Sequence, residues 1–466
     1  MPLLGIRMSF KRNLLRGIAF GSTLASLLLF SSCSGNISDS TVTISLTVRI
    51  SLDSLEAEGD GACFDEPPAI SSDGRYIAFA SDATNLVPSD TNGYTDVFVR
   101  DLLLGVTEQI SVPSVDATTP VTIIRGVSRN PSISADGRYV AFQSDNNFLS
   151  FESDNNGVTD IFLRDRETGK TLLISIDTTD SESADGISLN PSLSADGTKV
   201  AFQTLSDPVN GGNTSITQIY VRDHKLSTMD LVSCLSPTEP GDDASTNPAI
   251  AGEGTLIAFE TFAKNLDGYP SGGVDNDNES DIYCRDIVGL TTSLISRDDT
   301  GETGAKGDGS SYNASISYDG SCIAFQSHAT NLITGLPDGI SSDIFVRVNN
   351  SETYMISTHT SGGQGEGACI LPSISGDGRY VVFQSDEASL VNDDNNFSED
   401  IFLRDRTREV TTRISVATFG VEAINDSKFP AISQDGRYAA FWSIANNLAS
   451  DDSNGSADIF RRGPLD

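Results

Sequence analysis

The sequence predicts an all-β fold, a seven-bladed β-propeller of four-stranded antiparallel blades. Three observations predict it. A segment of about sixty residues recurs seven times, each copy has the pattern of four short strands, and the strand that the last copy lacks stands ahead of the first. Repeats at such a period indicate a repeat architecture, and four-stranded units arranged radially make a propeller.

The first half of each copy predicts a hairpin. It runs from a proline through a short strand and a tight turn into an apolar strand, as in PSISADGRYVAFQS from Pro131. The turn is Asp-Gly in six copies and Glu-Gly in one, and glycine accepts the positive φ that a two-residue hairpin needs. The turn glycines are 63, 60, 57, 66, 58 and 58 residues apart. They are Gly74, Gly137, Gly197, Gly254, Gly320, Gly378 and Gly436.

The second half of each copy supplies the third and fourth strands. The third has the form DIFLRD, which begins at Asp160 in the second copy, and the fourth has the form TLLIS, residues 171–175 there. Strands that are apolar on both faces indicate a sheet buried between neighbouring sheets.

The two ends of the repeat region predict how the ring closes. The last copy stops after its third strand, at Arg461 and Arg462, while LTVRIS from Leu46 to Ser51 has the pattern of a fourth strand. An N-terminal strand that completes the last blade removes the exposed sheet edges. We therefore expect residues 46–466 to form one closed propeller. An eighth blade would need an eighth turn, and the sequence has none.

The first 33 residues have the pattern of a secretory signal peptide. Basic residues precede an apolar run from Gly17 to Phe30, and small residues lead into Cys33. This ending resembles a bacterial lipoprotein box, which implies lipidation of Cys33. The alternative is an ordinary cleaved signal with Cys33 incidental. Ser34 after the cysteine suits the outer membrane of a Gram-negative cell. We expect an exported protein, tethered by residues 34–45 and facing the periplasm or the surface.

Charge excludes some partners. The chain has 65 acidic and 30 basic residues, a net charge of −35 and a pI near 4.2. Such a surface repels nucleic acid and anionic lipid head groups, so we expect no nucleic-acid partner and membrane attachment by the lipid anchor only. We also expect a monomer. Five further cysteines match no metal motif, and we expect them to be buried small residues.

The motifs also resemble a known repeat. The DGRYVAF and DIFLRD patterns resemble the WD-like propeller repeats of the TolB type over nearly all of the chain after Cys33. The resemblance implies the fold but not one activity, since such blades occur in scaffolds, in periplasmic proteins linked to translocation and beside peptidase domains. TolB-type proteins carry an α/β domain before the propeller, for which about a dozen residues after Cys33 leave no room.

Acidic loops before the third strand are the leading candidate for chemistry. Five copies read Asp-x-Asn/Asp-x-x-x-Asp, and oxygens in this spacing suit calcium, which takes six to eight oxygen ligands. The candidate ligands are Asp90, Asn92 and Asp96; Asp154, Asn156 and Asp160; Asp275, Asp277 and Asp281; Asp394, Asn396 and Asp400; and Asp452, Asn454 and Asp458. The alternative is local turns, which also favour Asp and Asn. In that case each strand-initiating aspartate pairs with the arginine four residues on, as Asp160 with Arg164.

Catalytic groups are sparse. The three histidines, His224, His328 and His359, occupy unrelated repeat positions, and no Ser-His-Asp set is indicated. Propeller lyases of the oligogalacturonate type use several histidines around a metal, which this chain does not offer. Regular repeats account for most of the chain. We therefore expect a non-catalytic envelope lipoprotein that binds an envelope protein or glycan. The alternative is a hydrolase or lyase acting on a carbohydrate or acidic substrate in the central channel.

Overall fold

The structure is a computed structural model. It describes residues 45–115, 126–150, 152, 154–176, 183, 185–209, 213–266, 278–298, 305–335 and 341–465. The signal segment, Cys33 and nearly all of the predicted tether lie outside the described residues.

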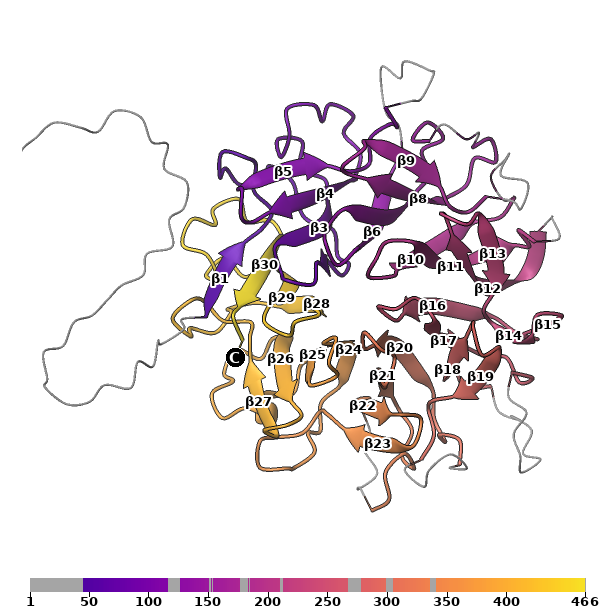
Figure 1. Cartoon of the computed structure of the whole chain (residues 1–466). Coiled ribbons are helices and arrows are strands. Elements are labelled where there is room, and N and C mark those ends of the chain that lie inside the picture. Colours follow the sequence, from indigo (N-terminus) through magenta and orange to yellow (C-terminus); the bar gives the residue numbers. More distant parts are fainter. Residues whose placement is uncertain are drawn as a thin grey trace, which may run out of the picture. The chain divides into compact units, whose positions relative to one another are not determined.

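Seven four-stranded antiparallel sheets stand around one centre, as predicted (Figure 1). Blade 1 contains β2 (Ala69–Ile70), β3 (Tyr76–Ser81), β4 (Asp96–Asp101) and β5 (Val106–Gln109). Blade 2 contains β6 (Ser128–Ile133), β7 (Tyr139–Ser144), β8 (Asp160–Asp165) and β9 (Lys170–Leu173). Blade 3 contains β10 (Ser188–Leu193), β11 (Lys199–Ser206), β12 (Asn213–Asp223) and β13 (Thr228–Leu231). Blade 4 contains β16 (Ser245–Ile250), β17 (Leu256–Thr261), β18 (Asp281–Asp286) and β19 (Thr291–Leu294).

Blades 5 to 7 repeat this order. Blade 5 contains β20 (Ser311–Ile316), β21 (Cys322–Ser327), β22 (Asp343–Val348) and β23 (Glu352–Met355). Blade 6 contains β24 (Cys369–Ile374), β25 (Tyr380–Ser385), β26 (Asp400–Asp405) and β27 (Val410–Arg413). Blade 7 contains β28 (Ser427–Ile432), β29 (Ala439–Ser443), β30 (Asp458–Gly463) and β1 (Leu46–Arg49). A small hairpin, β14 (Cys234–Ser236) with β15 (Glu239–Pro240), follows blade 3.

The predicted closure of the ring is confirmed. Strand β1 pairs antiparallel with β30, from Leu46 opposite Gly463 to Arg49 opposite Phe460. In Figure 1 the indigo strand β1 therefore lies beside the yellow strand β30. The first and last parts of the propeller are thus held by main-chain hydrogen bonds within one sheet.

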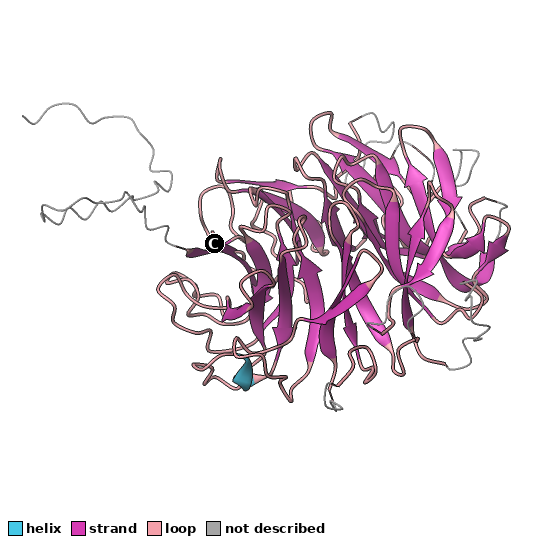
Figure 2. Cartoon of the chain, turned by 60° about the horizontal axis from the view of Figure 1, so that its bottom comes forward, coloured by secondary structure: helices cyan, strands magenta, loops and turns pink. Residues whose placement is uncertain are grey.

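Almost all regular structure is strand, and the helix drawn in Figure 2 is the short 3₁₀ turn η1 (Ala388–Leu390). Among the described residues no helix is long and apolar enough to cross a membrane. The apolar core lies between and within adjacent blades, where paired rings such as Phe142 and Phe162 stack with centroids 6.0 Å apart. All five described cysteines are free and buried, as expected.

The hairpin turns also lock neighbouring blades together. Gly137 has a φ of 72°, and a Cβ built there would lie 2.2 Å from Cδ2 of Tyr76 in the preceding blade. Gly74 meets Tyr438 in the same way, across the junction between blades 7 and 1. The repeat therefore needs glycine at these two turns for close approach as well as for backbone conformation.

The third-strand arginines do not pair with the aspartate at the start of their own strand. Arg347 is 1% exposed, and its Nη1 donates to the carbonyl of Asp298 at 2.6 Å and to Oγ1 of Thr353 at 2.8 Å. Arg164 likewise donates to the carbonyl of Pro113 and to Oγ1 of Thr171. The expected pairing of Asp160 with Arg164 is wrong. The guanidinium instead donates to main-chain carbonyls in the segment that follows the last strand of the preceding blade. The alternation of residues within one strand cannot predict these contacts.

Candidate functional site

The seven first strands enclose a hollow of about 500 Å³ on the axis of the ring. Every blade contributes to its wall. One lining residue of each blade stands directly before the first-strand proline, or before Ala314 in blade 5. These residues are Pro67, Asn130, Asn190, Asn247, Asn313, Leu371 and Phe429. A hollow built from every repeat is the central channel, the place where a propeller can surround a ligand.

A backbone bulge presents these lining residues. Asn130, the residue before Pro131, has a φ of 49°, and the corresponding residues of blades 3 to 7 have φ between 50° and 55°. The register of β6 on β7 shifts at this point. Proline cannot donate to a ladder, so the strand bulges around it. Blade 1 has Pro67 at this position, whose ring fixes a negative φ, and its first strand β2 has only two residues.

The bulged N–H groups are satisfied across blades by a belt of glutamines. Oε1 of Gln143 in blade 2 accepts from the N–H of Asn190 in blade 3 at 3.1 Å. Oε1 of Gln203 accepts from Asn247 N at 2.9 Å, and Oε1 of Gln384 accepts from Phe429 N at 3.1 Å. The second strand of each blade thus holds the channel wall of the next.

Glu66 replaces the missing glutamine of blade 1. Blade 1 has Ala80 where its neighbours have glutamine, and Oε1 of Glu66 accepts from Asn130 N at 2.7 Å instead. Glu66 is 9% exposed, and burial raises its pKa to about 7, although the Asn130 hydrogen bond and the charge of Arg129 act in the opposite direction. A buried carboxyl group beside the channel is therefore close to half ionised at neutral pH.

Two further charges lie on the blades that flank Glu66. Arg129 in blade 2 and Lys428 in blade 7 occupy the same repeat position as Glu66, one residue before the channel lining. The Arg129 guanidinium lies 3.4 Å above the centre of the Phe64 ring, and Lys428 Nζ lies 2.5 Å from Oε2 of Glu399. We call Lys428, Glu66 and Arg129 the charged arc. The other four blades carry uncharged residues at this position.

A second belt carboxylate is Glu260 in blade 4. It stands where other blades have glutamine, accepts from Asn313 N, and accepts from Nδ2 of Asn247 at 3.0 Å. Burial raises its pKa. Because its environment is that of the belt glutamines, Glu260 serves as a matched comparison for Glu66.

The channel wall has a polar side and an apolar side. Blades 2 to 5 present asparagines. Nδ2 of Asn130 donates to Oδ1 of Asn190 at 2.9 Å, and Nδ2 of Asn190 donates to Oδ1 of Asn247 at 2.6 Å. Blades 6, 7 and 1 present Leu371, Phe429 and Pro67. The two sides suit a ligand with hydroxyl groups on one edge and carbon on one face.

The acidic loops do not form one constellation. In blade 2, Nδ2 of Asn156 donates to Asp160 Oδ2 at 2.8 Å while its Oδ1 accepts from Val158 N at 2.8 Å. The same local turn holds Asn92 with Asp96 and Asn396 with Asp400. In blade 4, Asp275 and Asp277 lie outside the described residues. These asparagines therefore orient the strand-initiating aspartate, and no group of three or more acidic, His or Cys ligands gathers among the described residues.

Side-chain cations occupy three of the five loops. Arg413 Nη1 lies 3.1 Å from Asp394 Oδ1 and 3.5 Å from Asp400 Oδ2. Arg49 Nη1 lies 3.6 Å from Asp452 Oδ1 and 3.5 Å from Asp458 Oδ2. Lys306 Nζ lies 2.7 Å from Asp281 Oδ2. In blades 6 and 7 a guanidinium therefore lies within 3.6 Å of both aspartates that the spacing predicts as calcium ligands. Spacing within a repeat could not show this.

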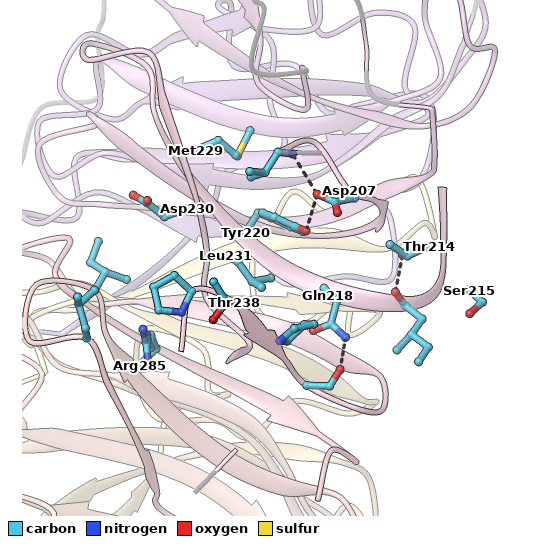
Figure 3. A pocket seen from close by; sticks show the side chains of 17 residues that line it. Asp207, Thr214, Ser215, Gln218, Tyr220, Met229, Asp230, Leu231, Thr238 and Arg285 are labelled. Atoms are coloured by element: carbon cyan, nitrogen blue, oxygen red, sulfur yellow. Dashed lines mark hydrogen bonds between the residues drawn. The ribbon is translucent and has the colours of Figure 1, made fainter. Parts of the chain in front are cut away.

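A second cavity, of about 600 Å³, lies beside blade 3 (Figure 3). Gln218 stands here in place of the strand-initiating aspartate and donates to the carbonyl of Gly241 at 3.0 Å, while Tyr220 Oη donates to Asp207 Oδ1 at 3.4 Å. The lining includes Asp207, Asp230 and Arg285 but no histidine or cysteine among the described residues. Arg285 is held by main-chain carbonyls and Thr292. Asp207, Asp230 and Tyr220 are thus on the lining of this cavity, whereas the lining of the channel hollow holds no titratable side chain within the described part of the chain.

The histidines are not brought together. His224 contacts the Tyr139 ring, His328 contacts the Tyr312 ring, and His359 lies 3.1 Å from Ser389 Oγ. They belong to three separate blades or their connections, so they form no shared site. Sequence reasoning missed Glu66 and the asparagine series. The recurrence of asparagine at the same position of four repeats, in three of them directly before proline, was the signal that could have revealed the channel wall.

Comparison with known proteins supports the fold. No protein-family model and no curated protein sequence matches the chain. An oligogalacturonate lyase from Vibrio parahaemolyticus matches with a TM-score of 0.52 and 12% identity over 91% of this chain and 95% of that chain. An oligogalacturonate lyase in complex with manganese matches with a TM-score of 0.52 and 12% identity over 90% and 93%. TolB from Acinetobacter baumannii matches with a TM-score of 0.39 and 15% identity over 74% and 64%. The two lyase structures show the same fold, the propeller that the repeats predicted.

The expected non-catalytic scaffold is contradicted. That prediction rested on the idea that regular repeats leave little of the chain for a reaction. The matched region covers 95% of the Vibrio lyase, so an enzyme can consist of little besides this fold. The prediction that the chain is not an enzyme is therefore wrong in its premise, because regular propeller repeats do not exclude a reaction.

Proposed function

We propose that the chain is an enzyme that cleaves an acidic oligosaccharide in its central channel. The observation that carries the proposal is Glu66, a buried carboxyl group that accepts from the channel-wall N–H of Asn130 and interacts with the charge of Arg129, while Lys428 occupies the equivalent position of blade 7. Catalytic carboxyl groups that transfer protons near neutral pH have raised pKa values, and burial of Glu66 provides such a value.

β-Elimination is the reaction that fits one carboxylate between two cations. Glu66 takes the proton from the carbon next to the sugar carboxylate. The electron pair left on that carbon forms a carbon–carbon double bond, the bond to the leaving sugar oxygen breaks, and that oxygen takes a proton from water. Arg129 and Lys428 bind the sugar carboxylate and stabilise the negative charge that develops on it.

The rest of the channel supports binding of a sugar chain. A sugar ring presents carbon on its faces and hydroxyl groups on its edge. The apolar side, with Leu371 and Phe429, suits the face, and the side-chain amides of Asn190 and Asn247 suit the hydroxyl groups. The three scattered histidines have no role in this proposal, which separates it from the histidine and metal chemistry of the lyases named above.

The test is cleavage of oligogalacturonates by the purified propeller, followed by the ultraviolet absorbance of the unsaturated product. Glu66→Gln should lower the rate at least about 100-fold, the range of general-base contributions. Glu260→Gln is the matched control and should keep the rate, because glutamine already occupies this position in four other blades. New reducing ends without unsaturated product would indicate hydrolysis instead. Absence of cleavage across acidic and neutral oligosaccharides would refute the proposal.

We further propose that the protein is exported and lipid-anchored at Cys33, as residues 1–33 indicate. Fatty-acid labelling that persists in Cys33→Ser would contradict this. The calcium expected from the acidic loops remains a proposal only where no side-chain cation stands in the loop.

A further inference from the structure

Two positions decide how each acidic loop is neutralised. The first lies on the fourth strand, opposite the aromatic residue of the third strand. Arg413 opposite Phe402 and Arg49 opposite Phe460 occupy it in blades 6 and 7. The second lies in the segment after the fourth strand. It is the later residue of an isolated β-bridge that forms there. Lys306 occupies it in blade 4, where it bridges Arg297.

Blade 4 shows that one cation at either position is enough. Its fourth-strand residue is Leu294, opposite Tyr283, and cannot compensate a carboxylate. The bridging Lys306 does so instead, with Nζ 2.7 Å from Oδ2 of Asp281, whose side chain is 1% exposed. Burying a carboxylate without a partner is costly, and in blades 4, 6 and 7 a lysine or arginine side chain compensates the buried aspartate.

Blade 2 has neither cation. Its fourth-strand residue is Leu173, opposite Phe162, and its bridging residue is Ser183, which pairs with Ile176. No lysine or arginine within the described part of the chain lies at ion-pair distance from Asp154 or Asp160.

Asp154 carries the clearest sign of an absent partner. It is 4% exposed, and neither of its carboxylate oxygens has a hydrogen-bond partner among the described residues. The N–H of Asn156 and the side chain of Ser183 lie nearby but outside hydrogen-bond geometry. Asp160 is fully buried next to it and interacts with its charge. Two buried carboxylates thus face each other without a positive group.

Blade 1 is the instructive contrast. Its fourth-strand residue is Gln109, opposite Phe98. Burial raises the pKa of Asp96, and the Gln109 side chain acts to lower it, against this larger effect. Asp96 also accepts from Asn92 Nδ2 at 2.8 Å and from Ser111 Oγ at 2.5 Å. Neutral donors therefore satisfy the strand-initiating aspartate there. In blade 2 Asp160 likewise accepts from Asn156 Nδ2 at 2.8 Å and from Ser175 Oγ at 2.5 Å, so Asp154 is the carboxylate left with neither a cation nor a donor among the described residues.

We propose that blade 2 binds one calcium ion between Asp154 and Asp160, in the place that a lysine or arginine side chain takes in blades 4, 6 and 7. Asp154 supplies two oxygens, Asp160 supplies one, and main-chain carbonyls and water complete the shell. Oxygen ligands with irregular geometry favour calcium over magnesium, which demands a near-ideal octahedron. The site does not depend on the proposed reaction.

The test is calcium titration of the EDTA-treated full chain by isothermal calorimetry, with the thermal midpoint measured alongside. The wild type should bind one equivalent at this site and gain thermal stability. Asp154→Asn should bind at least tenfold more weakly. Ser183→Lys reproduces the leucine and lysine pair of blade 4, so it should bind no calcium here and be as stable in EDTA as the wild type is in calcium.

Asp394→Asn in blade 6 is the matched control, since Arg413 already neutralises that loop, and it should leave calcium binding unchanged. Two results would overturn the proposal. One is a wild type that binds no stoichiometric calcium, in which case a shared proton neutralises the pair. The other is calcium binding that survives both Asp154→Asn and Ser183→Lys. Loss of calcium binding with cleavage intact would leave the channel proposal standing.

Discussion

Replacing Glu66 by glutamine should stabilise the protein in a pH-dependent way. In the folded protein burial raises the pKa of Glu66 to about 7 from a usual 4.5. Between these two values the folded state keeps a proton that the unfolded chain has lost, so stability falls as pH rises through this window. The fall is complete above about pH 7. Glutamine does not ionise, and its Oε1 can still accept from Asn130 N, as Gln143 does from Asn190.

The magnitude follows from the difference between the two pKa values. At 1.36 kcal/mol per pKa unit the penalty at pH 8 is about 3 kcal/mol. With an unfolding entropy of about 2.1 cal/mol/K per residue, a propeller of this size gains about 3–4 °C in its thermal midpoint. At pH 4 the variant and the wild type should unfold together, since both are then uncharged at residue 66.

Circular dichroism melts of both proteins from pH 4 to pH 8 provide the assay. Taking the difference between variant and wild type cancels the other carboxylates, which change equally in both. The exposed Glu253→Gln controls for the loss of one negative charge. A Glu66→Gln midpoint that stays with the wild type at pH 8 would show that Glu66 carries no uncompensated charge, and the assignment of Glu66 as a base would fall with it. A stabilised variant that no longer cleaves would separate the catalytic loss from unfolding.

Other perturbations test the contacts between blades. Gly74→Ala should destabilise the ring by about 2–4 kcal/mol, because the new Cβ would lie 2.5 Å from Tyr438. Gly254→Ala has the same φ of 69°, but its Cβ would lie 3.2 Å from Ser194 Cβ, so it should cost about 1 kcal/mol. Equal costs in chemical denaturation would argue against a close contact at Gly74. Arg347→Met should cost about 2–4 kcal/mol, since it leaves the Asp298 carbonyl without its buried donor, and the part-exposed Arg75→Met should have a much smaller effect on the same denaturation curve. Oligogalacturonate cleavage should fall at least about 100-fold in Glu66→Gln and persist in Glu260→Gln. Calcium should bind the wild type but not Ser183→Lys.

Much of the fold could be predicted because its rules are local. Turn glycines such as Gly137, the two-residue period of strands and the tail strand from Leu46 each act over a few residues, and their recurrence counts the blades. The same local reasoning explained the asparagines of the acidic loops, which hold Asx turns. It failed for function, since regular repeats do not exclude a reaction.

The tertiary structure alone decided which side chains of neighbouring blades contact one another. Glu66 matters because Ala80, in the same blade, leaves the N–H of Asn130 in the next blade without a glutamine acceptor. Arg164 binds carbonyls of the preceding blade and not its own aspartate. Leu173 and Ser183 matter because blades 6 and 4 have Arg413 and Lys306 at the equivalent positions, and these cations pair with the buried aspartates there. Each of these contacts joins residues more than a dozen positions apart or compares equivalent sites, so no periodicity within one repeat encodes it. The sequence by itself determined the blade, and packing between blades determined the channel wall and the charge that each buried aspartate faces.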